Sequence, residues 1–133
     1  MNKIKRRAPF FIIAGLLIFI FTLAYSLSQI HKDVKVACLK AKALYAQDCV
    51  DSLIKFVQSD ENSYRLRNTA IWALGQIADK KSLPYLQELN QSLPEQTKCS
   101  YDNYLCKYEV QKAIKWCEQG NLTSWMYGNK EKW

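Results

Sequence analysis

The first thirty residues contain a long apolar stretch without a break. Residues 8–30 include no charged side chain, and residues 9–25 are almost wholly apolar. A helix of roughly 20 apolar residues spans the hydrocarbon core of a membrane. A domain of this size cannot surround a helix that is apolar on every side. The pattern therefore predicts a transmembrane helix, or signal anchor, over residues 8–30.

A cleaved signal peptide is the alternative for this segment, because it shares the basic start and the apolar middle. Ala24-Tyr25-Ser26 and Ser26-Leu27-Ser28 both resemble small-x-small cleavage sites. The apolar run is longer than the roughly 7–15 residues of a usual signal core, which favours an anchor that stays attached.

Beyond residue 31 the apolar positions recur at helical spacing, with short polar breaks between them. One helix follows Asp48 as its N-cap, and its apolar face has the spacing i, i+3, i+4, i+7 at Val50, Leu53, Ile54 and Val57. Another begins after Ser82 with Pro84 in its first turn, where the missing N–H costs little. The last is predicted from about Asn103 to Glu118, with Gly120 as its stop.

Two of the predicted helices share one pattern of apolar positions. The offsets 0, 4, 7, 8 and 11 describe Leu66, Ala70, Ala73, Leu74 and Ile77. The same offsets recur forty residues later at Cys106, Val110, Ala113, Ile114 and Cys117. A period of ~33–47 residues is typical of helical repeats. An ordinary helical bundle has the same offsets, so the spacing alone leaves both architectures open.

The residues at 67–86 favour the repeat. Residues 67–79, followed by Ser82-Leu83-Pro84-Tyr85-Leu86, resemble a HEAT-like repeat of the phycobilisome-lyase type. In that family two Ala and a Gly, here Ala70, Ala73 and Gly75, let neighbouring helices approach closely. The match covers about one repeat, and residues 34–58 and 103–118 match as degenerate flanking repeats. The whole chain is similar to small bacterial HEAT-repeat proteins of undefined function.

The resemblance implies an all-α fold, with the single N-terminal transmembrane helix followed by a short HEAT-like α-solenoid of about two and a half helix pairs. The repeat domain is expected over residues 31–118. Such stacks need capped ends. We expect residues 119–133 to form the C-terminal cap, with the end of the last helix covered by Trp125, Met126 and Tyr127.

Charge gives the predicted anchor a direction. The chain has 19 Lys and Arg against 12 Asp and Glu, a formal net charge of +7. Four of the basic residues lie in the first seven positions, at Lys3, Lys5, Arg6 and Arg7. Basic flanks stay on the cytoplasmic side, so residues 1–7 are predicted to be a cytoplasmic tail and the helical domain to be periplasmic or extracellular. Because the excess is mostly at this flank, it does not indicate nucleic-acid binding.

All the cysteines follow the apolar segment, at Cys38, Cys49, Cys99, Cys106 and Cys117. This density is ordinary for an exported domain. Cys99 lies in a loop that can fold back onto the turn with Cys106, and we predict a disulfide between them. Cys38 and Cys49 are expected at opposite ends of two antiparallel helices, too far apart to bond. An odd number leaves at least one thiol unpaired.

The composition excludes several kinds of site. His31 is the one histidine, which excludes a multi-His metal site, and it lies beside the apolar segment, so we expect no Ser-His-Asp triad inside a folded core. The sequence has no Cys-x-x-Cys pair and no Gly-rich phosphate loop. Cys49 is the one candidate for a reactive thiol by its position, but the adjacent Asp48 carboxylate disfavours a thiolate there. We expect no metal, no cofactor, no small-molecule substrate and no enzymatic activity.

The sequence favours a membrane-tethered interaction module that binds another protein on the non-cytoplasmic side. Arg and aromatic side chains are enriched at interfaces, and those off the core stripe give a candidate partner-binding surface of Arg65, Arg67, Trp72, Gln76 and Lys112. For Trp72, packing between helix pairs is the alternative. Two other functions stay open, an accessory subunit of a membrane complex and a thiol-active or lyase-like accessory enzyme. Phycobilisome lyases attach bilins, but no residue here marks a chromophore pocket.

Overall fold

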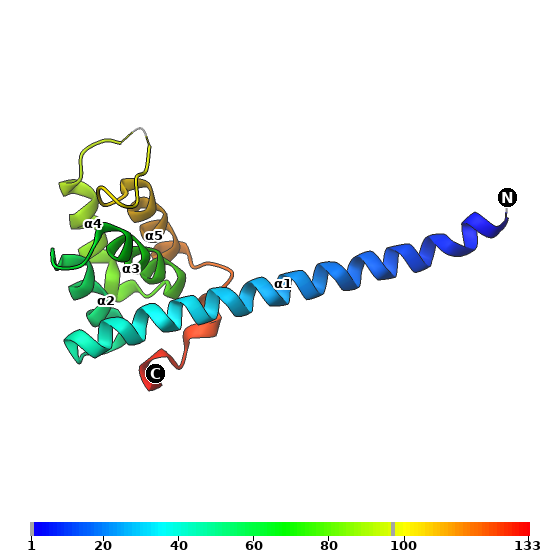
Figure 1. Ribbon diagram of the computed structural model, residues 1–133, viewed down its shortest axis with the longest axis horizontal. Coiled ribbons are helices and arrows are strands. Elements are labelled where there is room, and N and C mark those ends of the chain that lie inside the picture. Colours follow the sequence, from blue (N-terminus) through cyan, green and yellow to red (C-terminus); the bar gives the residue numbers. More distant parts are fainter. Residues whose placement is uncertain (1, 97) are drawn as a thin grey trace. The chain divides into compact units, whose positions relative to one another are not determined.

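The computed structural model describes residues 2–96 and 98–133, with side chains from residue 9 onward. The predicted all-α class is confirmed, and the described residues contain no strand. The α-helices are α1 (Asn2–Tyr45), α2 (Cys49–Gln58), α3 (Tyr64–Ile77), α4 (Leu83–Ser92) and α5 (Lys107–Gln119) (Figure 1). Short 3-10 helices are η1 (Lys80–Ser82), η2 (Ser124–Tyr127) and η3 (Lys130–Lys132).

The chain forms two compact units, residues 1–32 and residues 33–133, and α1 passes through the boundary. In the first unit the large apolar side chains are exposed, for example Phe10 and Phe21. This helix is long and apolar enough to cross a membrane. The basic residues on which the orientation prediction depends, Lys3, Lys5, Arg6 and Arg7, lie outside the residues whose side chains are described.

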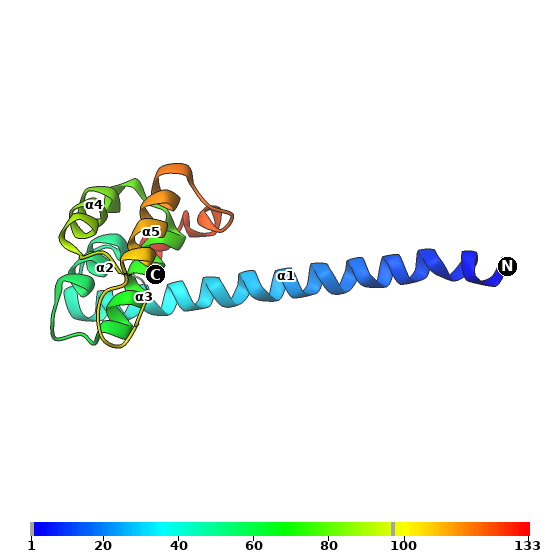
Figure 2. The same ribbon diagram turned by 90° about the horizontal axis from the view of Figure 1, so that it is seen from above.

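In the second unit α3 packs against α2 and α5, and α5 also packs against α4 (Figures 1 and 2). The apolar face predicted for α2 lies in the core, where Val50, Leu53 and Val57 are buried. Asp48 is the N-cap of α2, as predicted, and its carboxylate accepts a hydrogen bond of 2.9 Å from the Asp51 N–H. Local capping and helical periodicity therefore place α2 correctly from the sequence.

Helices α3 and α5 approach closely at Gly75. A Cβ atom on Gly75 would lie 2.9 Å from the Ala113 Cα atom and 3.0 Å from the Trp116 ring. Real Cβ atoms do not come so near to a backbone atom, so the contact requires glycine. This is the close helix approach that the resemblance implied for Gly75.

Helix α5 begins at Lys107, four residues later than the predicted start near Asn103. The residues just before α5 form a loop of turns and not a helix. The buried side chain of Asn68 stabilises this loop through hydrogen bonds to the backbone of Tyr101, Tyr104 and Cys106. The predicted end is confirmed. Gly120 terminates α5 with a φ of 77°, a left-handed value that favours glycine.

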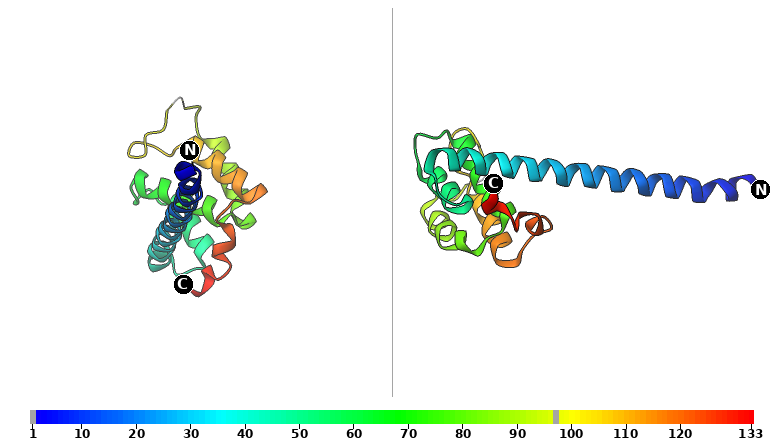
Figure 3. Two further views of the ribbon diagram at one scale, coloured as in Figure 1. Left: turned by 90° about the vertical axis from the view of Figure 1, so that its right-hand side faces the viewer. Right: turned by 90° about the horizontal axis from the view of Figure 1, so that it is seen from below.

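The C-terminal residues contact α3 and return to α1. The Asn121 side chain donates hydrogen bonds to the carbonyl oxygens of Gly75 and Gln76 at the end of α3. Trp133 lies beneath the Lys35 ammonium of α1, and its carbonyl accepts a hydrogen bond from Lys42. Figure 3 shows the path of the chain from α5 to the C-terminus. Trp125 is 73% exposed, so the expectation that it covers the last helix is wrong.

The arrangement of α1 and α2 contradicts the expectation for Cys38 and Cys49. The structure pairs them as a disulfide, with Cα atoms 5.3 Å apart. Seven residues further along each helix, the rings of Tyr45 and Phe56 are also in contact, with centroids 6.4 Å apart. The two helices therefore advance in the same general direction and not in opposite directions.

The short connection between the helices explains this result. Seven helical residues from Cys38 to Tyr45 cover about 10.5 Å, and the four Cα steps from Tyr45 to Cys49 can span up to about 14 Å. The connection is therefore long enough to run back along α1. Its first residue, Ala46, has a left-handed φ of 51°, which turns the chain at the end of α1.

Candidate functional site

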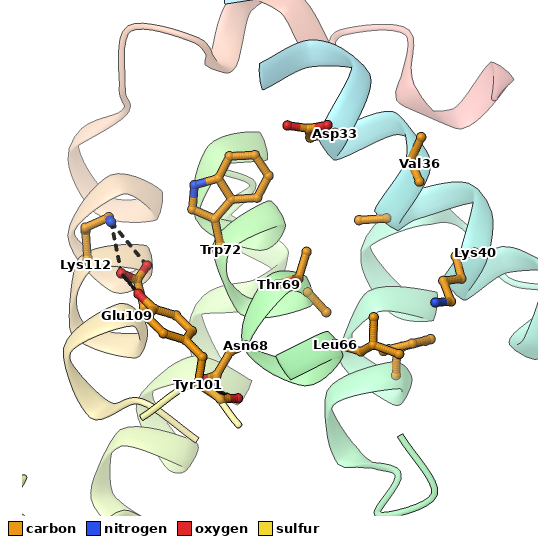
Figure 4. Close-up of a pocket in the computed structure, with 13 residues that line it drawn as sticks. Asp33, Val36, Lys40, Leu66, Asn68, Thr69, Trp72, Tyr101, Glu109 and Lys112 are labelled. Atoms are coloured by element: carbon orange, nitrogen blue, oxygen red, sulfur yellow. Dashed lines mark hydrogen bonds and ion pairs between the residues drawn. The ribbon is translucent and has the colours of Figure 1, made fainter. Parts of the chain in front are cut away.

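An open groove of about 620 Å³ lies in the second unit, beside the part of α1 that belongs to it. One wall is a single face of α1, with Asp33, Val36, Ala37 and Lys40 spaced i, i+3, i+4 and i+7 (Figure 4). Val36 is 63% exposed although it is apolar. This wall therefore offers apolar surface between two charged positions.

The opposite wall is α3, which runs the other way. Leu66 and Thr69 lie towards the Lys40 end and Trp72 towards the Asp33 end (Figure 4). Phe56 of α2 also lines the groove. Trp72 is half-buried, so part of its indole ring is available to a ligand. The rest of the Trp72 side chain is covered, so the alternative of packing between helix pairs stays open.

A polar cluster from α5 and the preceding loop closes one side of the groove. The buried Glu109 carboxylate accepts a hydrogen bond of 2.9 Å from the Tyr101 hydroxyl and is paired with the Lys112 ammonium at 3.1 Å. Lys112 also lies 5.0 Å from the centroid of the Trp116 ring. Burial, and then the hydrogen bond to Glu109, raise the pKa of Tyr101, so the phenol stays protonated and donates.

Asn68 fixes the loop that carries Tyr101. Its amide nitrogen donates to the carbonyl oxygens of Tyr101 and Tyr104, at 3.2 and 2.9 Å. Its amide oxygen accepts from the Cys106 N–H at 2.8 Å. All polar atoms of a fully buried side chain are thus used to hold one loop against α3.

Disulfides support both sides of the groove. The structure pairs Cys99 with Cys106, with Cα atoms 5.2 Å apart, across the loop of Tyr101. The Cys38–Cys49 pair joins the α1 wall to α2. Cys117 is the free thiol among the described cysteines, and it is buried. Burial raises its pKa, although the Ser82 hydroxyl at 3.2 Å opposes that shift.

The structure brings together two residues of the predicted partner-binding surface. Trp72 and Lys112 both line the groove. Arg67 and Gln76 were expected to be exposed, and that expectation is wrong. Arg67 is buried and donates to the Val57 carbonyl at 2.6 Å, and Gln76 is buried against the Thr123 hydroxyl at 2.6 Å. Arg65 is exposed and forms a two-point ion pair with Asp102, away from the groove lining.

Several groove residues were missed by the sequence reasoning. Glu109 is a charged residue beside the apolar stripe of its helix, three positions after Cys106, and that unusual placement is the signal that could have identified it. Asn68 lies off the apolar stripe of its helix, so the sequence gives no such signal for it. Tyr101 lies in a loop whose path no pattern predicts. The α1 wall could not be predicted because no pattern in the sequence shows that the apolar helix continues without a break to Tyr45.

The lining of the groove is mainly apolar, with a few charged side chains. No group of three or more His, Cys, Asp or Glu side chains suited to a metal ion occurs within the described part of the chain. The groove combines apolar surface, one accessible indole edge and a few charges, which is the mixture found at binding sites for peptides and proteins.

Stacked helix pairs joined by short connections define a class of helical repeat protein. The family model for HEAT repeats matches residues 22–97, which is 76 of the 133 residues. The chain therefore belongs to the HEAT repeat family, whose members commonly mediate protein–protein interaction. No curated protein and no solved structure matches the chain.

Proposed function

We propose that this chain is a membrane-tethered, non-enzymatic interaction module, in which the HEAT-repeat unit binds another protein on the non-cytoplasmic side of a membrane. The groove between α1 and α3 is the binding site. The observation that carries this proposal is an open groove of about 620 Å³ with an accessible Trp72 and an exposed apolar Val36. Exposed apolar surface of this kind is typical of interaction sites.

The tether and the side of the membrane rest on the N-terminal segment. The helix is apolar over residues 9–25 and exposes its large side chains. The basic residues before it favour a cytoplasmic N-terminus. The cysteine pairs favour an oxidising compartment for the second unit, since disulfides persist there and are rare in the cytosol.

The non-enzymatic part of the proposal is supported by the state of the candidate nucleophiles. Cys49, the one thiol singled out by position, is buried and paired with Cys38. Cys117 is buried with a raised pKa, so it supplies little thiolate at neutral pH. The thiol-active alternative therefore has no accessible thiol to act with.

Site-specific photocrosslinking in native membranes tests the binding site. A photoreactive residue replaces Thr69, which is exposed on the groove wall, and in a matched variant it replaces Gln87, which is exposed on α4. We expect a discrete crosslinked protein from position 69 that is absent from position 87. Equal labelling from both positions, or none from position 69, would count against the groove as the site.

Protease digestion of intact and of permeabilised cells tests the side of the membrane. We expect the second unit to be cut when protease is added outside the cytoplasmic membrane, while a tag placed before residue 1 stays protected. The reverse pattern would move the domain to the cytosol and overturn the proposed location.

A further inference from the structure

The two disulfides differ in the exposure of their cysteines. Cys38 and Cys49 are both fully buried, where α1 meets α2. In the second pair Cys106 is fully buried, whereas Cys99 is partly exposed in the loop before α5. Thiol–disulfide exchange begins with the attack of a thiolate on one sulfur of the pair, so it requires access to that sulfur. A thiolate from outside can therefore attack the second pair, and it attacks at Cys99.

Cys106 is placed to be the leaving group of this attack. When a thiolate bonds to Cys99 Sγ, the bond between the two cysteines breaks and its electron pair goes to Cys106 Sγ. Cys106 is the N-cap residue of α5. An N-cap side chain lies near the N–H groups of the first helical turn, at the positive end of the helix dipole. Because Cys106 is buried from water, this helix end stabilises the departing thiolate.

The segment that leads to Cys99 is held against the start of α5 by a side-chain clamp. The amide nitrogen of Gln96 donates a hydrogen bond of 2.9 Å to the Leu105 carbonyl. Its amide oxygen accepts a hydrogen bond of 2.9 Å from the Lys107 N–H. Gln96 thus bonds to the residues on either side of Cys106, so the chain stays close to Cys106 even when the disulfide is open.

The residues next to Cys99 are held by further hydrogen bonds that do not involve sulfur. The Lys98 carbonyl accepts a hydrogen bond of 2.7 Å from the Tyr104 hydroxyl. On the other side of Cys99, the Tyr101 carbonyl accepts a hydrogen bond from the buried Asn68 amide. These contacts keep the loop in place when the disulfide is reduced, so opening of the pair does not require unfolding of the unit.

We infer that the Cys99–Cys106 pair is a thiol–disulfide exchange site, at which a dithiol protein reduces the pair by attack on Cys99 and release of Cys106. The first thiolate of the dithiol protein forms a mixed disulfide with Cys99, and Cys106 takes up a proton. The second thiolate of that protein then attacks its own first sulfur and releases Cys99, which is protonated in turn. The partner ends as a disulfide, and this chain gains two electrons and two protons.

The reverse reaction restores the resting disulfide. The Cα atoms of Cys99 and Cys106 are 5.2 Å apart, and the clamp keeps them near each other after reduction. Two groups held in this way have a high effective concentration, so the pair closes again when one of its sulfurs is oxidised. Cys99 does not line the groove, so the exchange site does not depend on the proposed binding there.

Reduction of the full chain by a dithiol protein tests the site, with Cys38–Cys49 as an internal control. The probe is a reduced thioredoxin-fold protein with a Cys-x-x-Cys motif, added to the chain in nanodiscs at pH 7. After an acid quench, new thiols are alkylated and located by peptide mass mapping. We expect thiols at Cys99 and Cys106 at least about tenfold faster than at Cys38 and Cys49, because the buried pair reacts only after local opening.

Two results would overturn this assignment. One is the reduction of Cys38–Cys49 first or at the same rate. The other is no reduction of either pair while the probe reduces a disulfide-bonded reference peptide. After removal of the probe, the reduced chain should keep its far-UV circular dichroism, and a loss of helix would contradict an opening confined to the loop.

A matched pair of variants tests which sulfur is attacked. Cys106→Ser leaves Cys99 as a thiol, and Cys99→Ser leaves Cys106 as a thiol. Serine is a good N-cap residue, so α5 is retained in the first variant. A small aromatic disulfide reagent should modify Cys99 at least about tenfold faster than Cys106, because only Cys99 is partly exposed. Equal rates, or faster reaction at Cys106, would refute the direction of attack.

Gln96→Ala tests the clamp, with Gln91→Ala as the control because Gln91 is exposed on α4. Closure of the pair is measured at equilibrium in a glutathione buffer. Loss of the two Gln96 hydrogen bonds should lower the closure constant by about three- to tenfold, while the control keeps the original value. A closure constant for Gln96→Ala equal to that of the control would show that the clamp does not hold the two cysteines together.

Discussion

Replacement of Asn68 by Ala should strongly destabilise the second unit. Asn68 is fully buried and makes three hydrogen bonds to the backbone of the loop that carries Tyr101. Alanine leaves the Cys106 N–H without its partner in a buried position. It also removes the donor that holds the carbonyl oxygens of Tyr101 and Tyr104.

The size of the loss follows from these contacts. A buried backbone donor without an acceptor costs about 1–3 kcal/mol. The two carbonyl groups can recover part of their loss from water, because the loop is partly exposed, so they add about 1 kcal/mol together. The free energy of unfolding should fall by about 2–4 kcal/mol in total, which is large against a typical stability of about 5–15 kcal/mol.

Urea unfolding of the full chain in nanodiscs, followed by tryptophan fluorescence, measures this loss. With a slope of about 2 kcal/mol per molar urea, the midpoint should move down by roughly 1–2 M. Asn103→Ala is the matched control, because Asn103 is exposed in the same loop and bonds to the Ser100 hydroxyl. That variant should unfold within about 0.5 kcal/mol of the original chain.

Asn68→Asp separates hydrogen bonding from packing. The carboxylate has nearly the same shape and can still accept from the Cys106 N–H, but when ionised it cannot donate to the carbonyl oxygens of Tyr101 and Tyr104. We expect a loss at least as large as with alanine at neutral pH. If either Asn68 variant unfolded within about 0.5 kcal/mol of the original chain, the reasoning about this hydrogen-bond cluster would be refuted.

Three further predictions follow from the packing and the charges. Gly75→Ala should lower the free energy of unfolding by about 1–3 kcal/mol, because the new Cβ atom would lie 2.9 Å from the Ala113 Cα atom. Unchanged stability in thermal or urea unfolding would show that α5 shifts freely to make room. Iodoacetamide at pH 7 should not label the buried Cys117 in the folded chain, and it should add one label per chain in urea without reductant. Intact mass measures the labelling, and rapid labelling of the folded chain would contradict the burial of Cys117. Burial raises the pKa of Asp48 and of Asp79, but hydrogen bonds and nearby lysines lower each more, so the net shift is downward. Both therefore stabilise the fold above about pH 4 and should lose that effect as the pH falls further, which denaturation midpoints between pH 6 and pH 3 would test.

The helices of the second unit could largely be predicted from local signals. The Asp48 cap, the apolar face at Val50 and Leu53, and the Gly120 stop all depend on neighbours within about two turns of the chain. The start of α5 could not be predicted in this way. The helical spacing continues back to residue 103, but Asn68, about forty residues earlier, takes the backbone groups that a longer helix would need.

The candidate site was predicted only in fragments. Trp72 and Lys112 could be selected because they lie at equivalent places off the apolar stripes of two successive helices, and aromatic side chains are enriched at interfaces; both line the groove. Arg67 and Gln76 satisfied the same rule, yet each found a buried hydrogen-bond partner in a distant segment. Sequence periodicity predicts which face of a helix is apolar. It does not predict which polar groups of a distant segment will lie beside the other faces.

The sequence by itself determined the all-α class, the membrane-length apolar segment, the caps and apolar faces of the helices, and the small residues that let α3 and α5 meet. These features depend on contacts within a few turns or on the composition of one segment. Only the tertiary structure decided that Cys38 lies beside Cys49, that Asn68 holds the loop of Tyr101, and that α1 and α3 form the walls of one groove. The physical reason is that the direction of a chain after a short connection depends on a few backbone angles, such as those of Ala46, and sequence periodicity carries no information about them.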